Sequence, residues 1–274
     1  MSTFDDLDKL KSLRQKVDWE IESERCELLN QLYPVVENWK GKLPNLRDIF
    51  HPEEIDWLLT EAVKCNKHED KPEPLVEFVA SSGYKDEPEA VEDDKPSSRR
   101  TTPIHHAARC PLRNRCIVRE LFKVYDRFDV NYTDELEFSH FHVACMYSCV
   151  DVVKKFLELG QDPDCLAQKS VDPPLHFALK NGDEELVGLL LRNGADPNMA
   201  DAEGSTPLHT ICKKNDDDSL AKMLFEISDE KHQLVQMDTK DKLGRTPLQL
   251  AVKRIVCRQK RIVCRQIRGI FFCV

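Results

Sequence analysis

The stretch of sequence that decides the fold runs from residue 176 to residue 209 and reads HFALKNGDEELVGLLLRNGADPNMADAEGSTPLH. The apolar residues between 186 and 191 are spaced to form one stripe along a helix. Gly194 follows them, where a glycine can end the helix by adopting a positive φ. Thr206 and Pro207 predict the next helix start, because a threonine oxygen caps free N–H groups and proline suits the first helical position. The stretch therefore predicts short antiparallel helices joined by an outward turn.

The TPLH pattern at residues 206–209 recurs along the chain. Its copies are TPIH at 102–105, SHFH at 139–142, PPLH at 173–176 and TPLQ at 246–249. The last position of the pattern steps by 37, 34, 33 and 40 residues, and a second anchor at Asn131, Asp164, Asn198 and Asp238 steps by 33, 34 and 40. Two anchors that drift together indicate a true repeat with insertions. A unit of two short helices cannot bury its apolar face alone, so neighbouring units are expected to stack into a solenoid.

These residues resemble the ankyrin repeat, whose signature is T-P-L-H-x-A at a period of about 33 residues. The resemblance covers residues 102–252, with about four repeats of which the last is incomplete. It implies an all-α solenoid of stacked helix–turn–helix units, preceded by an N-terminal helical extension. It also implies a non-catalytic scaffold that binds a partner protein through one concave surface.

Histidines and cysteines in the repeats suggest metal or nucleophilic chemistry, but their spacing favours structural roles. His105, His142, His176 and His209 occur one per unit, so we expect them to form hydrogen bonds across the turns between repeats. Cys145 and Cys212 lie at core positions, where cysteine acts as a small hydrophobe. A zinc cluster of Cys110, Cys116, Cys145 and Cys149, with or without His105, lacks finger-like spacing. No metal and no cofactor is therefore predicted.

Residues 1–84 are predicted to form an N-terminal helical region. Leucines recur every three or four residues over 2–40, which predicts an amphipathic helix that packs on the body, with a coiled coil as the alternative. Residues 53–84 resemble a divergent capping repeat, and terminal repeats are often atypical. Residues 85–101 are acidic, contain proline and predict a flexible linker or loop.

The segment 253–274 departs from the family, because a glycine and a leucine-rich helix should follow TPLQLAV. It is basic, and the hexapeptide RIVCRQ occurs in it twice. A basic amphipathic helix for membranes or acidic partners is one interpretation. The favoured interpretation is a frameshifted or truncated gene end that leaves apolar surface of the last repeat exposed.

Composition excludes several function classes. The chain has 274 residues, a net charge of −9 and eleven cysteines. An acidic total argues against a general nucleic-acid binder, and the lack of an apolar run near 18 residues argues against a membrane span. The acidic start has no apolar core of a secretory signal. We therefore expect reduced thiols and a cytoplasmic or nuclear monomer.

The predicted function is protein binding, and no catalytic residue is predicted. Alternatives are a substrate-recognition subunit of a ubiquitin ligase or an inhibitor of a transcription factor, either of which needs a docking element in residues 1–60. A more remote alternative is an enzyme with its chemistry in residues 1–84. Mapping by repeat position places the partner-binding residues on the turns and the first helices. They are Met146, Tyr147, Lys180, Asn181, Met199, Ala200, Ala202, Glu203, Ser205, Lys213, Lys214, Thr239, Lys240 and Lys242.

Overall fold

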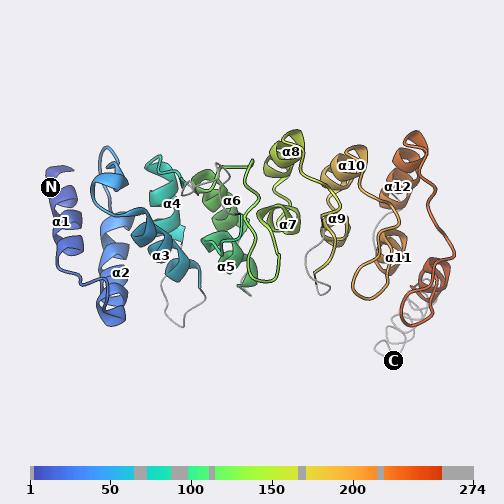
Figure 1. Cartoon of the computed structure of the whole chain (residues 1–274), viewed down its shortest axis with the longest axis horizontal. Helices are drawn as coiled ribbons and strands as arrows, with labels where there is room; N and C mark the ends of the chain where they lie inside the picture. Colours follow the sequence, from blue (N-terminus) through green and yellow to red (C-terminus); the bar gives the residue numbers. More distant parts are fainter. Residues whose placement is uncertain are drawn as a thin grey trace, which may run out of the picture. The chain divides into compact units, whose positions relative to one another are not determined.

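The computed structural model describes residues 3–64, 73–87, 98–110, 115–165, 171–214 and 219–254. The chain divides into two compact units, Met1–Val143 (unit 1) and Ala144–Val274 (unit 2). Regular secondary structure in the described residues is helical, apart from isolated bridges that join Thr133 to Arg99 and to Ser139 (Figure 1). The predicted all-α fold class is confirmed.

Unit 1 is built from helices that pack in pairs. They are α1 (Thr3–Gln15), α2 (Glu22–Glu37), the 3-10 turn η1 (Leu46–Asp48), α3 (Pro52–Val63), α4 (Glu73–Ser81), α5 (Pro103–Arg109) and α6 (Arg115–Val124), and the unit ends within α7 (His140–Met146). α1 packs on α2, α2 on α4, and α3 on both α4 and α5. α6 packs on α4 and α5. The expected capping repeat at 53–84 contains α3 and α4.

The single helix expected over residues 2–40 is wrong, because the chain turns between α1 and α2. The backbone N–H of Asp18 donates to Glu24 Oε2 at 2.7 Å, and the N–H of Glu20 donates to Asp18 Oδ1 at 3.0 Å. Aspartate side chains compete in this way with helical hydrogen bonds. Both helices still bury their leucines, including Leu10 and Leu28.

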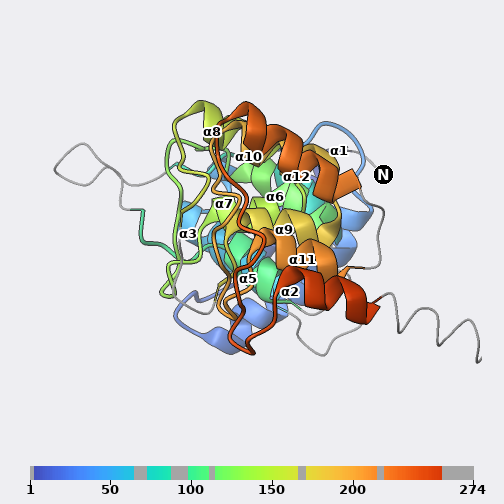
Figure 2. The same cartoon turned by 90° about the vertical axis from the view of Figure 1, so that its right-hand side faces the viewer.

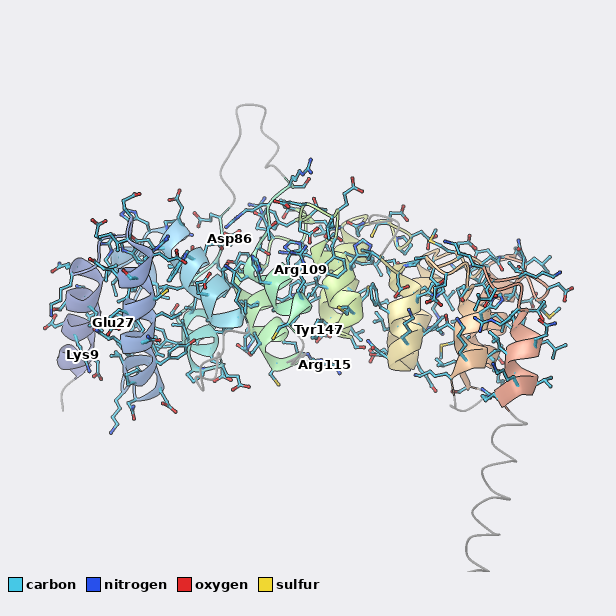
Figure 3. The ribbon with its side chains drawn as sticks, turned by 90° about the horizontal axis from the view of Figure 1, so that it is seen from below. Lys9, Glu27, Asp86, Arg109, Arg115 and Tyr147 are labelled. Carbon is cyan, nitrogen blue, oxygen red and sulfur yellow. The ribbon has the colours of Figure 1, made fainter. Side chains whose placement is uncertain are left out.

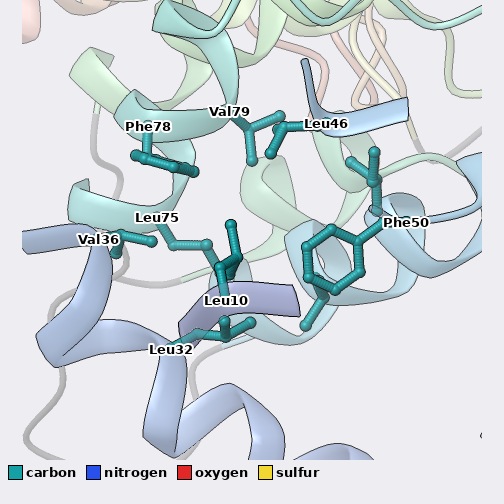
Figure 4. Close-up of a pocket in the computed structure, with 10 residues that line it drawn as sticks. Leu10, Leu32, Val36, Leu46, Phe50, Leu75, Phe78 and Val79 are labelled. Atoms are coloured by element: carbon teal, nitrogen blue, oxygen red, sulfur yellow. The ribbon is translucent and has the colours of Figure 1, made fainter. Parts of the chain in front are cut away.

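The core of unit 1 leaves a small apolar cavity of about 20 Å³. Figure 4 shows its lining, in which Leu10, Leu32 and Leu75 approach Phe50 from three different elements. The lining side chains are all apolar, so a water molecule in the cavity would find no polar partner. We therefore regard the cavity as a packing defect and not as a binding site.

Unit 2 consists of helix pairs in two layers. Its helices are α8 (Val150–Glu158), α9 (Pro174–Asn181), α10 (Glu184–Arg192), α11 (Pro207–Lys213) and α12 (Ser219–Glu230), followed by a helix over 247–254. α9 packs on α11 in one layer, and α10 packs on α8 and α12 in the other (Figure 2). We call α9, α11 and the helix over 247–254 the inner helices, and α8, α10 and α12 the outer helices.

The boundaries of α9 and α10 follow from local chemistry. Gly182 ends α9 with φ 76°, a left-handed conformation that costs glycine little. Asp183 then caps α10 by accepting from the N–H of Leu186 at 3.0 Å. Leu186, Leu190 and Leu191 are at most 1% exposed, so the predicted apolar stripe forms the core of unit 2.

The helix over 247–254 exposes apolar side chains, as the sequence predicted for the last repeat. Leu248 is 68% exposed, whereas Leu208, at the same position of α11, is 7% exposed. Val252, one turn further on, is also exposed. The remainder of the predicted atypical tail, residues 255–274, lies outside the described residues.

Candidate partner-binding surface

The turn at residues 201–205 holds its shape through the carboxylate of Asp201. Asp201 Oδ1 accepts from the N–H groups of Glu203 at 2.9 Å and of Ser205 at 2.8 Å. Gly204 adopts φ 74°, which a residue with a Cβ rarely adopts. The side chains of residues 202 and 203 therefore project from a fixed frame, and both are exposed.

The turn at residues 241–245 repeats this design and is bonded to the first turn. Asp241 Oδ1 accepts from the N–H of Arg245 at 2.9 Å, and the Arg245 guanidinium pairs with the other carboxylate oxygen at 2.6 Å. The side-chain hydrogen bond from Arg245 lowers the pKa of Asp241 to about 2. The N–H of Lys242 donates to the carbonyl oxygen of Glu203 at 3.0 Å, so the two turn tips are linked.

His209 joins α11 to the second turn. Its Nδ1 accepts from the N–H of Thr206 at 3.1 Å, so the proton of the neutral ring lies on Nε2. Nε2 then donates to the carbonyl oxygen of Arg245 at 2.9 Å. The His209 ring therefore caps the N-terminal end of α11 and binds the turn at residues 241–245.

His176 has the same role in the preceding repeat. Its Nε2 donates to the carbonyl oxygen of Met199 at 2.8 Å, and its Nδ1 accepts from the hydroxyl of Thr210 at 3.1 Å. Burial lowers the pKa of His176, although the bond to Met199 and the charge of Asp201 oppose the shift. The predicted role of these histidines, hydrogen bonding between repeats, is confirmed for His176 and His209.

The inner helices present lysines and an asparagine beside these turns. Lys180 Nζ lies 2.6 Å from Asp172 Oδ2. Lys213 Nζ donates to Ser205 Oγ at 2.8 Å and lies 3.6 Å from Glu203 Oε2. Lys180 and Lys213 remain exposed, so a partner could reach both amines.

The predicted partner-binding residues divide by exposure. Eight are exposed: Lys180, Asn181, Ala200, Ala202, Glu203, Lys213, Lys240 and Lys242. Four are half-buried: Met146, Met199, Lys214 and Thr239. Two, Tyr147 and Ser205, are buried. The first two groups remain candidates for contact with a partner.

The prediction that Tyr147 and Ser205 face solvent is wrong. Tyr147 is 6% exposed (Figure 3), and Asn181 of the following repeat lies over its turn by donating to the Met146 carbonyl and to Ser148 Oγ. Burying a large aromatic ring is favourable wherever a neighbour covers it. Ser205 is fully buried, and its Oγ accepts from Lys213 Nζ at 2.8 Å.

Unit 1 contains a polar cluster that the sequence analysis missed. Arg100 pairs with Asp56 at 2.9 Å and with both oxygens of Asp86 at 3.0 Å. Tyr125 donates to Asp56, and Tyr132 donates to Asp86 at 3.2 Å. The cluster joins α3 to the segment that precedes α5 and to the segment that follows α6.

Burial governs the protonation of this cluster. It raises the pKa of Asp86, against the opposing charge of Arg100. It also raises the pKa of Tyr132 to about 12, with help from the Asp86 charge. Burial alone would lower the pKa of Arg100, but Asp56 and Asp86 raise it on balance. Arg100 is thus a fixed cation inside a structural cluster.

The described end of the predicted linker or loop, from residue 98 onward, is bonded to the rest of unit 1. Besides the ion pairs of Arg100, the backbone N–H of Thr133 donates to the carbonyl oxygen of Ser98 at 2.7 Å. The N–H of Arg100 donates back to Thr133 at 2.9 Å. Residues 88–97 of the predicted linker lie outside the described residues.

Cysteines in the described residues are of two kinds. Cys26, Cys116, Cys145, Cys149, Cys165 and Cys212 are thiols. Cys110 is disulfide-bonded, so the expectation of reduced thiols is wrong at this position. Cys145 is fully buried, which raises the pKa of its thiol. No group of three or more His, Cys, Asp or Glu side chains suited to a metal occurs in the described part of the chain.

Two family models identify the repeated helices. The model for ankyrin repeats in three copies matches residues 175–264, and that for ankyrin repeats in many copies matches residues 141–191. Residues 141–264 are therefore ankyrin repeats. Ankyrin repeats are non-catalytic protein-interaction modules, so the chain has a protein-binding role.

Curated relatives share this region. Ankyrin repeat and SOCS box protein 11 of Mus musculus is 33% identical over 147 residues, which is 53% of this chain and 43% of the relative. The putative palmitoyltransferase ZDHHC13 of Danio rerio is 32% identical over 47% of this chain and 19% of the relative. The palmitoyltransferase AKR1 of Kluyveromyces lactis is 32% identical over 63% of this chain and 23% of the relative. The chain thus spans less than half the length of each of these relatives.

The matches to the two palmitoyltransferases cover less than a quarter of either relative. Among the described residues, no helix has the length and apolar character needed to cross a membrane.

Proposed function

We propose that this chain is a non-catalytic scaffold, monomeric and located in the cytoplasm or nucleus, that binds a partner protein through unit 2. The binding surface comprises the turn tips at 199–205 and 239–245 together with the exposed sides of α9 and α11. The observation that carries the proposal is the linked frame of these turns. Their backbone N–H groups are already bonded, and the exposed side chains between them need little ordering when a partner binds.

Affinity capture with a matched pair of variants tests this proposal. Ala202 is exposed on the first turn tip, and Leu159 is 60% exposed at the end of outer helix α8. Ala202→Arg and Leu159→Arg place the same charged side chain on different sides of unit 2. The partner captured by the wild type should be lost with Ala202→Arg and kept with Leu159→Arg, at unchanged melting temperature. Equal retention by both variants would refute the proposed surface.

A second candidate is a substrate-recognition subunit of a ubiquitin ligase. The similarity to a protein whose name joins ankyrin repeats to a SOCS box favours it. The docking element it requires was expected in residues 1–60, where α1 and α2 bury Leu10, Leu28 and Leu32 in unit 1. Ubiquitination of the captured partner should rise in cells that overproduce this chain. An unchanged level would remove this candidate and leave the scaffold proposal in place.

A further inference from the structure

Three lysines occupy one position in the three inner helices of unit 2. Lys180, Lys213 and Lys253 are each the sixth residue after the proline that opens the helix, and all three are exposed. α9 packs on α11, and Arg254, next to Lys253, donates to the carbonyl oxygen of Lys214 at the end of α11. The three amines therefore follow one another from repeat to repeat. We call them the lysine row.

The helices that carry the lysine row contain no acidic residue. Their sequences are PLHFALKN, PLHTICK and PLQLAVKR. The outer helices α10 and α12 instead carry Glu184, Glu185, Glu226, Asp229 and Glu230. In a chain with a net charge of −9, the inner helices of unit 2 thus carry a row of positive charges, and the acidic partners of two of them, Asp172 and Glu203, lie on the neighbouring turns.

The spacing of the row fits an extended peptide. Axes of packed helices lie about 8–10 Å apart, so lysines at one register follow at about that interval. A chain extended in the polyproline II conformation advances about 3.1 Å per residue and has three residues per turn. Side chains three residues apart therefore lie on one side of such a segment, about 9 Å apart, where they can meet successive lysines.

The row is also held in place by neighbouring side chains. Lys180 pairs with Asp172, and Lys213 with Ser205 and Glu203. These contacts limit the freedom of two of the amines before a partner arrives. Because exposed ion pairs contribute about 1 kcal/mol or less, an incoming carboxylate can share or replace them at small cost.

We propose that the lysine row binds an extended acidic segment of the partner protein, with carboxylates three residues apart. The inference rests on the proposed function, since it names the chemistry of the partner at the same surface. It assigns recognition to Lys180, Lys213 and Lys253 and leaves the turn tips to add contacts beyond the row.

The probe is a fluorescein-labelled peptide with three glutamates placed three residues apart among serines and glutamines. Fluorescence anisotropy measures its binding to the whole chain at low and high salt. The test variant is Lys180→Gln with Lys213→Gln and Lys253→Gln. The matched control is Lys154→Gln with Lys222→Gln and Lys231→Gln, which removes the same charge from the outer helices and the end of α12.

The test variant should bind the peptide about tenfold more weakly than the wild type, and the control should match the wild type. A peptide with the same glutamates placed consecutively should bind more weakly than the spaced one. Equal binding by the test variant and the control would overturn the proposal, as would no binding by the wild type. Tighter binding of single-stranded DNA, lost in the test variant, would also overturn it by assigning the row to nucleic acid.

This outcome is separable from that of the proposed function. If Ala202→Arg abolishes capture of the partner while the acidic peptide fails to bind, the scaffold proposal is supported and the proposal of an acidic partner segment is refuted. The peptide could instead bind through the lysine row while Ala202→Arg captures the partner normally. That result would refute the proposal that the turn tips belong to the binding surface.

Discussion

Replacing Gly204 with alanine should destabilise unit 2 about twice as much as the same change at Gly244. Both glycines lie at the same place in equivalent turns, with φ 74° and φ 73°. A left-handed conformation costs a residue with a Cβ about 1–2 kcal/mol. Alanine also lowers the conformational entropy of the unfolded chain, which offsets about 0.4–1 kcal/mol of that cost. Each substitution should therefore cost about 1 kcal/mol from backbone conformation alone.

The two sites differ in what the new methyl group meets. At Gly244 no atom lies within 4 Å of an added Cβ, whereas at Gly204 the backbone nitrogen of Lys242 lies at 3.2 Å. That nitrogen donates the 3.0 Å bond to Glu203 which links the two tips. Displacing it should weaken this bond, at a cost of about 1 kcal/mol. Gly204→Ala should thus cost about 2 kcal/mol in total.

Urea unfolding followed by helical circular dichroism measures both variants against the wild type. The free energy of unfolding should fall by about 2 kcal/mol for Gly204→Ala and about 1 kcal/mol for Gly244→Ala. Equal losses would show that the contact between the tips does not contribute. A larger loss at Gly244 would refute the reasoning altogether.

Three other changes are expected to have measurable effects. Glu137 adopts φ 60° where the equivalent turns have glycine, so Glu137→Gly should raise the free energy of unfolding by about 1 kcal/mol in urea titrations. Leu190→Ala empties a fully buried position and should cost about 2–5 kcal/mol, with a matching fall in melting temperature. Burial lowers the pKa of His105 to about 4, so the unfolded chain takes up a proton near pH 6.5 while the folded chain remains neutral. Stability should therefore fall between pH 6.5 and pH 4 by roughly 3 kcal/mol from this group, and His105→Gln should flatten that dependence in unfolding titrations.

The helices of unit 2 could be predicted from sequence because short-range chemistry determines them. Gly182, Asp183 and the Thr206–His209 pattern each fix a helix boundary through contacts within a few residues. The spacing of the repeat histidines indicated a structural role, and His209 has that role through its bond to the Arg245 carbonyl.

The predictions that are wrong involve contacts between residues that are distant in sequence. Tyr147 has the register of an exposed residue, but Asn181, 35 residues from Met146, bonds to the turn beside it. Arg100 lies in a segment rich in charge and proline, and the carboxylates that hold it come from Asp56 and Asp86. Aspartates and an arginine at those positions look like ordinary surface residues until the fold brings them together.

The position of a residue in the repeat predicted its exposure for part of the candidate site. Ala202 and Lys213 are exposed as expected from their register. Lys253 could have been found by extending the same register to the helix over 247–254.

The central claim is that a partner protein binds the inner side of unit 2, and site-specific photocrosslinking tests it most directly. A photoreactive amino acid is placed in cells at Ala202 or Lys213, or at Leu159 or Lys222 on the outer helices. We predict that adducts with one protein form from Ala202 and Lys213 and not from Leu159 and Lys222. Adducts from the outer positions alone, or the same adduct from all four, would contradict the claim.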